Sequence, residues 1–204
     1  MRLHCGTTNP GKLREFRLGL AGFDVEPLPG LGGIPPAPEM GASFEENAVL
    51  KARYYGARSP GLVFADDSGL EVRALGGEPG IRSARFAGEK ASDQDNNRLL
   101  LARLAGCKDR SARFVCVIAL AEGDRVLGTF EGAVEGVIAA APEGEGGFGY
   151  DPLFYYPGLE RTFGQLTWEE KLRVSHRGRA LARMRRVLEG CGATSRTLHF
   201  SRDF

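Results

Sequence analysis

Two long β-rich runs near the middle of the chain constrain its fold more than any other feature. The runs cover Phe114 to Ala121 and Val126 to Val137, and both are dense in β-branched and apolar residues. Only a few residues around Glu122, Gly123 and Asp124 separate them, and such a short connection joins neighbouring antiparallel strands. The sequence therefore predicts a long antiparallel hairpin, around which the other elements must be arranged.

Shorter strands and capped helices are expected on either side of this hairpin. A strand at Leu3 to Cys5 leads through a loop into an amphipathic helix, and a second strand is predicted near Val25 to Leu28. Hydroxyl residues suited to cap later helices stand at Ser43, Ser92, Thr167 and Ser175. Gly190 is expected to end the last helix. We predict one mixed-sheet α/β domain over residues 1–204, which the hairpin could divide into two lobes.

Composition and charge argue against several classes of protein. The 204 residues are 42% hydrophobic and 26% charged, as in ordinary globular proteins. The formal net charge is only +1, whereas proteins that bind nucleic-acid backbones usually carry a basic excess. No apolar run approaches the roughly 18 residues of a membrane span, and no secretion signal opens the chain. We therefore expect a cytoplasmic protein with neither a nucleic-acid nor a membrane partner.

The cysteines point to the same compartment. Cys5, Cys107, Cys116 and Cys191 lie far apart in the sequence, without the short paired spacing of a zinc site or a redox pair. We expect free thiols in a reducing environment.

The loop before the first predicted helix has the features of an anion site. Its sequence is Gly6, Thr7, Thr8, Asn9, Pro10, Gly11, Lys12. This run matches the first seven positions of a P-loop, but Leu13 replaces the hydroxyl residue that would bind magnesium, so a P-loop ATPase is not expected. Free backbone N–H groups, the positive helix end and the Lys12 ammonium still favour phosphate. The alternative is a tight turn with a solvated lysine.

Two adjacent acids follow the predicted strand at Leu62 to Ala65. Asp66 and Asp67, with Ser68 and Gly69 after them, are expected at the end of that strand, where burial and mutual repulsion oppose ionisation. A divalent cation would resolve this conflict, because carboxylates and substrate phosphates are usual magnesium ligands. A remaining carboxylate could then activate a water molecule. The alternative is a turn in which one aspartate caps backbone N–H groups.

Two further segments suit a flat, polar ligand. Gly144 to Asp151 is rich in glycine and offers Phe148 for stacking and Asp151 for hydrogen bonding, although a tight turn before the next strand needs the same residues. Lys171 and the run Ser175 to Arg177 gather several donors near a helix start. The alternative for this second segment is a solvated basic helix, since more arginines follow.

Taken together, six segments resemble the inosine/xanthosine triphosphate pyrophosphatase family. They are Thr7 to Lys12, Ser43 to Ala52, Ala65 to Leu70, Leu75 to Arg85, Gly146 to Pro152 and Glu170 to Arg177. The resemblance implies hydrolysis of purine triphosphates with a damaged base, such as ITP, dITP and XTP, to the monophosphate and pyrophosphate. It also implies a magnesium ion and a homodimer. We expect the substrate cleft between the two lobes.

The resemblance also implies roles for individual residues. Asp67 would be the catalytic, metal-linked proton acceptor, and Ser68 would contact the substrate. Phosphate would be bound by Thr7, Thr8, Asn9, Pro10, Gly11 and Lys12, and the base by Phe148, Gly149, Tyr150, Asp151, Lys171, His176 and Arg177. The family often has two acids before the glycine at Gly41, but here Pro38 precedes a single acid, Glu39. Glu39 is the expected second metal ligand, with Glu46 as a nearby competitor.

These assignments predict a mechanism. Lys12 and Lys51 would neutralise charge on the departing pyrophosphate while Asp67 positions the attacking water. Donors on His176 and Arg177 would match a 6-oxo group and oppose the 6-amino group of adenine. Two alternatives stay open: a pyrophosphatase for modified pyrimidine triphosphates, and an RNA-binding module that uses the arginine-rich last helix.

Overall fold

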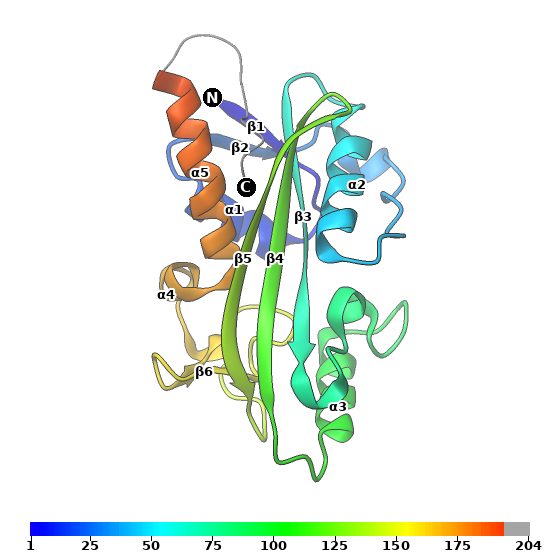
Figure 1. Cartoon of the computed structure of the whole chain (residues 1–204), viewed down its shortest axis with the longest axis vertical. Coiled ribbons are helices and arrows are strands. Elements are labelled where there is room, and N and C mark those ends of the chain that lie inside the picture. Colours follow the sequence, from blue (N-terminus) through cyan, green and yellow to red (C-terminus); the bar gives the residue numbers. More distant parts are fainter. Residues whose placement is uncertain (194–204) are drawn as a thin grey trace.

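The computed structural model describes residues 1–193 and is organised around one seven-stranded sheet (Figure 1). The strands are β1 (Arg2–Cys5), β2 (Asp24–Pro27), β3 (Leu62–Val72), β4 (Ser111–Glu122), β5 (Arg125–Ile138), β6 (Phe154–Tyr156) and β7 (Arg161–Thr162). Their order across the sheet is β2-β1-β3-β4-β5-β6-β7. β1 is parallel to both its neighbours, and every later pair is antiparallel. The predicted mixed sheet is confirmed.

Helices cover both faces of the sheet. They are α1 (Pro10–Gly19), α2 (Phe44–Gly56), α3 (Asp93–Arg103), α4 (Trp168–Val174) and α5 (His176–Ala193), with 3₁₀ turns η1 (Leu31–Gly33), η2 (Arg73–Leu75), η3 (Gly80–Arg85) and η4 (Phe163–Gln165). α1 and α5 lie on one face and α2 lies on the other (Figure 1). Within residues 1–193, no helix has the length and apolar character to cross a membrane.

The predicted hairpin is present and is longer than the sequence indicated. β4 and β5 pair from Ser111↔Val137 to Glu122↔Arg125, and β3 pairs with β4 along its whole length. One half of the molecule has a separate apolar cluster on each face of the sheet, and the other half has a third cluster. The two expected lobes therefore share β3, β4 and β5, which makes them halves of one domain.

The alternation of side chains along β3 explains the two clusters that flank it. Phe64 points to the α1 and α5 face, where its ring meets that of Phe16 edge-on at 5.0 Å between centroids. Val63 and Ala65 point to the α2 face. Because successive side chains of a strand alternate between faces, the two acids that follow must also diverge.

The prediction that these acids end their strand is wrong. β3 continues through Asp66 and Asp67 to Val72, because Leu70 and Val72 are buried in the third cluster. It is β1 that ends here: its pairing with β3 is confined to His4↔Val63 and Cys5↔Phe64, after which the chain turns away toward α1. The acids therefore lie beside an opening in the sheet.

Most helix caps agree with the sequence. Capping boxes form at Ser92 and Thr167, and the N–H of Gly178 donates to Ser175 Oγ at 3.1 Å. At Ser43 only half of the expected box forms, since the Glu46 carboxylate accepts from the N–H of Ala42. Gly190 does not end α5, which continues to Ala193, because its backbone has no left-handed turn.

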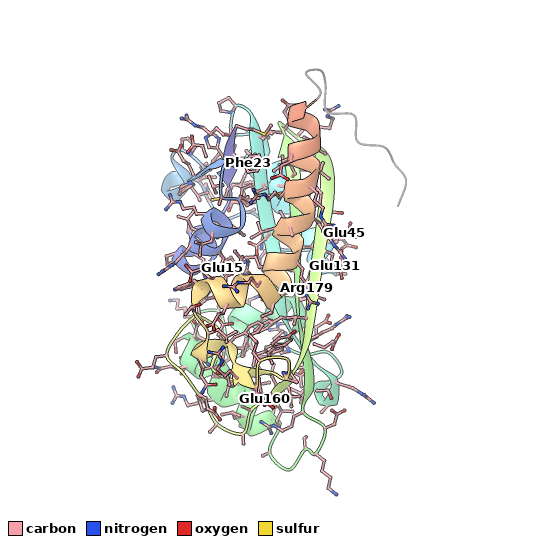
Figure 2. The ribbon with its side chains drawn as sticks, turned by 90° about the vertical axis from the view of Figure 1, so that its left-hand side faces the viewer. Glu15, Phe23, Glu45, Glu131, Glu160 and Arg179 are labelled. Carbon is pink, nitrogen blue, oxygen red and sulfur yellow. The ribbon has the colours of Figure 1, made fainter. Side chains whose placement is uncertain are left out.

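The free edge of β5 is covered by arginines of α5. β6 pairs only with Val137 and Ile138 of β5, so the preceding residues of β5 have no strand on that side within the described chain. Arg179 Nη1 donates to the carbonyl of Ala133 at 2.6 Å, and Arg183 Nη1 donates to that of Glu131 at 2.7 Å. Figure 2 shows Arg179 where α5 lies along β5. These arginines satisfy backbone groups instead of forming a free basic face.

Close packing of α5 on β5 requires a glycine at position 132. A Cβ added at Gly132 would collide with the backbone of His176 and Ala180. We expect Gly132→Ala to lower the free energy of unfolding by about 1–3 kcal/mol, the usual cost of an overpacked core. Urea denaturation measures this loss. Gly32→Ala is the control, because open space surrounds Gly32; equal stability of both variants would contradict this packing.

Candidate active site

The loop between β1 and α1 has the local structure of an anion site. Asn9 caps α1 by accepting from the N–H of Lys12 at 3.1 Å, and Pro10 occupies the first turn. Thr7 Oγ1 accepts from the N–H of Asn9 at 3.2 Å. Gly11 has no Cβ, and the Phe148 ring packs against the position that a Cβ would occupy. The helix start is therefore in direct contact with the predicted stacking residue.

Asp67 lies on the α2 face of β3 within a cluster of charged groups. Lys51 Nζ is 2.7 Å from Asp67 Oδ1 and 2.5 Å from Glu39 Oε1. Asn47 Nδ2 donates to Asp67 Oδ2 at 3.3 Å. Burial raises the pKa of Asp67 above its ordinary value, although Lys51 opposes this effect. Asp67 therefore has the environment of a proton acceptor that holds a proton more readily than a solvated carboxylate.

Glu39 is held between two cations. Besides Lys51, Arg85 of η3 donates from Nη1 to Glu39 Oε2 at 2.5 Å. Burial alone would raise the pKa of Glu39, but Lys51 and Arg85 together lower it. Glu46 uses its carboxylate to accept from Ala42 and makes no contact with this cluster. Of the two acids considered in this region, Glu39 is the one whose carboxylate lies beside that of Asp67.

The residues of this cluster suit magnesium better than a metal enclosed by protein ligands alone. No group of three His, Cys, Asp or Glu side chains converges within residues 1–193. Magnesium commonly takes one or two carboxylates and completes its shell with water and substrate phosphates. Asp67 and Glu39 place two carboxylate oxygens on either side of the Lys51 ammonium, which fits this ligand set.

Asp66 lies on the opposite face of β3 and has a different environment. Its Oδ1 accepts from Lys12 Nζ at 3.0 Å, and its Oδ2 accepts from Arg177 Nη2 at 3.2 Å. Ser68 Oγ also donates to Oδ2 at 3.2 Å. Burial would raise the pKa of Asp66, but Lys12 and Arg177 hold it well below its usual range. Asp66 is thus a permanent anion with both oxygens occupied.

Glu15 of α1 joins the two cationic residues of the predicted base site, and sequence reasoning missed it. The side chain is 1% exposed, with Oε1 2.7 Å from Lys171 Nζ and Oε2 paired with Arg177 Nη1. Lys171 also pairs with Asp151. Figure 2 labels Glu15 between α1 and the segment that carries α4. One signal could have revealed it: Glu15 follows Lys12 by three positions, on the same side of α1.

A cavity of about 120 Å³ lies where the two halves of the domain meet. It is lined by Asn9, Lys12, Ser68, Gly69, Ser83, Ala84, Asp93, Asn96, Phe114, Phe148, Gly149, Tyr150, Asp151, Lys171, His176 and Arg177. Of the predicted site residues, Thr7, Thr8, Pro10, Gly11, Lys51, Asp67 and Glu39 are not part of this lining. The cavity therefore holds the predicted base-recognition residues, and the charged cluster of Asp67, Glu39 and Lys51 lies on the other face of β3.

The aromatic and donor groups of the cavity are fixed by their neighbours. Phe148 donates its backbone N–H to Asp151 Oδ2 at 2.8 Å, and Lys171 Nζ lies 4.6 Å from the centre of the Phe148 ring. Tyr150 uses its hydroxyl to donate to the carbonyl of Ser83, so its phenol supports the wall instead of offering a donor. Gly149 adopts a left-handed backbone with φ of 62°.

Two buried nitrogens of this wall have no hydrogen-bond partner among the described residues. They are His176 Nδ1 and Arg177 Nε. The His176 ring stacks on Phe114 with 4.6 Å between centroids, and burial lowers its pKa well below the ordinary value. The imidazole is therefore neutral and can present either a donor or an acceptor, depending on its tautomer.

Known proteins resemble this chain in sequence and in fold. The model of the Ham1 family matches residues 3–187. The chain belongs to the Ham1 family. Among similar proteins, a dITP/XTP pyrophosphatase of Acidobacterium capsulatum is 49% identical over 192 residues, covering 89% of this chain and 95% of that protein. One of the same name from Thermus thermophilus is 52% identical over 186 residues, covering 89% and 88%.

Solved structures of the Ham1 family agree with this assignment. The Staphylococcus aureus Ham1 protein matches with a TM-score of 0.83 and 43% identity, covering 93% of this chain and 99% of that one. A HAM1 protein from Coxiella burnetii matches with the same TM-score at 38% identity. The family predicted from the six sequence segments is therefore confirmed.

The buried pairs of Glu15 should make stability depend on pH. Glu15 has a lowered pKa because Arg177 and Lys171 outweigh the effect of burial. Because the pKa of Glu15 is lower in the folded protein, its ionised carboxylate stabilises the fold fully at any pH above its pKa in the unfolded chain, about 4.3. This stabilisation is lost as the pH falls from there through the pKa of the folded protein. We expect Glu15→Gln to cost about 3–5 kcal/mol at pH 7, and the difference from wild type to shrink below about pH 4.

Urea denaturation at pH 7 and pH 3.5 measures this difference. Glu189→Gln is the control, because Glu189 pairs with Arg185 on the exposed face of α5 and should contribute at most about 1 kcal/mol. A difference between wild type and Glu15→Gln that stays constant with pH would contradict the ionised, paired state of Glu15.

Proposed function

We propose that this protein hydrolyses non-standard purine nucleoside triphosphates, namely ITP, dITP and XTP, to the monophosphate and pyrophosphate. One observation carries the proposal: a cavity walled by Phe148, His176 and Arg177 continues directly into the anion loop at Lys12, beside the carboxylates of β3. A base and a triphosphate need such adjacent sites. The names of the related dITP/XTP pyrophosphatases support the same activity.

The reaction requires a base, a cation and charge neutralisation at the leaving group. Asp67 would accept the proton of the attacking water, since burial raises its pKa while it still faces Lys51. Lys12 and Lys51 would stabilise the charge that develops on pyrophosphate. We further propose that Asp67 and Glu39 hold magnesium, which would supply Lewis-acid stabilisation of the phosphates.

Base selection would depend on donors of His176 and Arg177, two residues that line the cavity. The Arg177 guanidinium is a permanent donor, and the neutral His176 imidazole donates from whichever ring nitrogen is protonated. Hypoxanthine and xanthine present a 6-oxo acceptor, whereas adenine presents a 6-amino donor that would leave these groups unpaired. An unpaired buried polar group costs about 1–3 kcal/mol, so several such mismatches reject adenine effectively.

The physiological context is also proposed. We infer a cytoplasmic enzyme that removes damaged nucleotides from the pool and acts as a homodimer without a nucleic-acid or membrane partner. Arg179 and Arg183 are engaged with backbone carbonyls of β5, which argues against the RNA-binding alternative. The pyrimidine alternative has no support among the relatives, whose names specify dITP and XTP.

The role of Asp67 can be tested by Asp67→Asn. We expect its kcat for dITP to fall by at least about 100-fold, because general-base catalysis contributes about 10²–10⁴. Pyrophosphate release at saturating magnesium measures the rate. Asp24→Asn, which removes an exposed carboxylate of β2, should leave it unchanged. A rate near wild type for Asp67→Asn would remove Asp67 from the mechanism.

Magnesium dependence can be tested with the wild-type protein and Glu39→Gln. We expect EDTA to abolish dITP hydrolysis and added magnesium to restore it, and Glu39→Gln to need more magnesium for half-maximal rate. Substrate choice is checked in the same assay with dITP, XTP, dATP, dUTP and dTTP. Full activity in EDTA, or faster turnover of dUTP than of dITP, would contradict the proposal.

A further inference from the structure

Asp66 lies between the phosphate-binding loop at Lys12 and the cavity proposed to bind the base. Its Oδ1 accepts a hydrogen bond from Lys12, at the start of α1, and its Oδ2 accepts one from Arg177, which lines the cavity. Arg177 Nη2 also donates to Ser68 Oγ at 2.7 Å, and Ser68 in turn donates to Asp66. One buried carboxylate, 4% exposed, thus contacts cations from α1 and α5 at once.

Buried charges of alternating sign continue from Asp66 into the base wall. Arg177 bridges Asp66 and Glu15, and Lys171 bridges Glu15 and Asp151. Asp151 then accepts the backbone N–H of Phe148. Displacing one member would leave its neighbours buried and unpaired, which costs several kcal/mol. The positions of Lys12 and Phe148 are therefore linked through contacts that do not involve the substrate.

The contacts of Asp66 leave it no direct chemical role. Its two oxygens accept from Lys12, Arg177 and Ser68, and Cys116 Sγ lies 3.8 Å from Oδ2. Asp67 also has both oxygens paired, with Lys51 and Asn47, but it lies beside a second carboxylate, whereas Asp66 faces two cations. Asp67, which follows it in β3, is the carboxylate that faces Lys51 and Glu39.

We propose that Asp66 is a positioning residue that fixes the phosphate-binding Lys12 and the base-binding Arg177 relative to each other. A substrate then has its phosphates correctly placed for attack only when its base fits beside Arg177. This inference rests on the proposed function. Base recognition then affects the chemical step as well as binding, because the group that aligns Arg177 also aligns Lys12. Asp66 acts through these two cations and does not touch the reacting atoms.

Asp66→Asn tests this role while preserving the shape of the side chain. The amide would place a donor against the donors of Lys12 or Arg177 and so disturb one of them. We expect kcat/KM for dITP to fall by about 100-fold, the loss that a misplacement of about 1 Å can cause. The ratio of kcat/KM for dITP to that for dATP should fall about tenfold, because Arg177 would no longer be held in the position that favours a 6-oxo base. The shape of the pH–rate profile should stay that of wild type.

A matched control and a second variant keep the test decisive. Glu71→Gln removes another carboxylate of β3, which pairs with Arg113 outside the site, and should leave both ratios within about twofold of wild type. Asp66→Glu keeps the charge but lengthens the side chain. It should lower the melting temperature less than Asp66→Asn does, because an anion still faces Lys12 and Arg177. It should still lose kcat/KM and base discrimination per folded enzyme, so that a folding defect in Asp66→Asn does not obscure the result.

Several outcomes would overturn the inference. If both Asp66 variants kept the wild-type kcat/KM and the wild-type preference for dITP over dATP, the relative positions of Lys12 and Arg177 would not depend on this carboxylate. Loss of the acid limb of the pH–rate profile in Asp66→Asn would make Asp66 the base itself. A lowered melting temperature with unchanged kinetics per folded enzyme would leave Asp66 a purely structural residue. Failure of the proposed function is distinguishable, because wild type would then not hydrolyse dITP or XTP.

Discussion

The pairing of Arg177 with Glu15 and Asp66 is the interaction on which the site depends. The guanidinium is 1% exposed, and such a charge is tolerable in a protein interior only when buried anions compensate it. Glu15 comes from α1 and Asp66 from β3, so one side chain of α5 ties together the helix, the sheet and the cavity. The cost of burying these charges constrains three elements to one relative arrangement, and that arrangement forms the pocket.

The end of β1 gives the site its second constraint. After Cys5 the chain leaves the sheet, and among residues 1–193 the two acids of β3 have a strand neighbour on the β4 side alone. Lys12 approaches β3 from the α1 face and Lys51 approaches from the α2 face. Strand alternation then gives consecutive aspartates unlike surroundings, with opposite effects on their pKa values. Two consecutive residues of the sequence thus provide one carboxylate that stays ionised and one whose pKa is raised.

Local signals explain what could be predicted from the sequence. The hairpin, the caps at Ser92 and Thr167, and the anion loop at Asn9 and Lys12 each depend on residues close together in the chain. The pairing of Glu15 with Arg177 could not be found in this way, because the two residues lie 162 positions apart. The unbroken run of β3 through Asp66 to Gly69 was missed for a related reason: burial of Leu70 by distant elements overrides the turn tendency of Ser68 and Gly69.

The arginine-covered edge of β5 has a consequence for assembly. An unprotected strand edge is a template on which another chain can add a strand, which leads to sheet extension or aggregation. Here an incoming strand would have to displace the guanidinium groups of Arg179 and Arg183 from the carbonyls of Ala133 and Glu131. Along this stretch, association between copies must therefore use side-chain surfaces, and growth into a continuous intermolecular sheet is disfavoured.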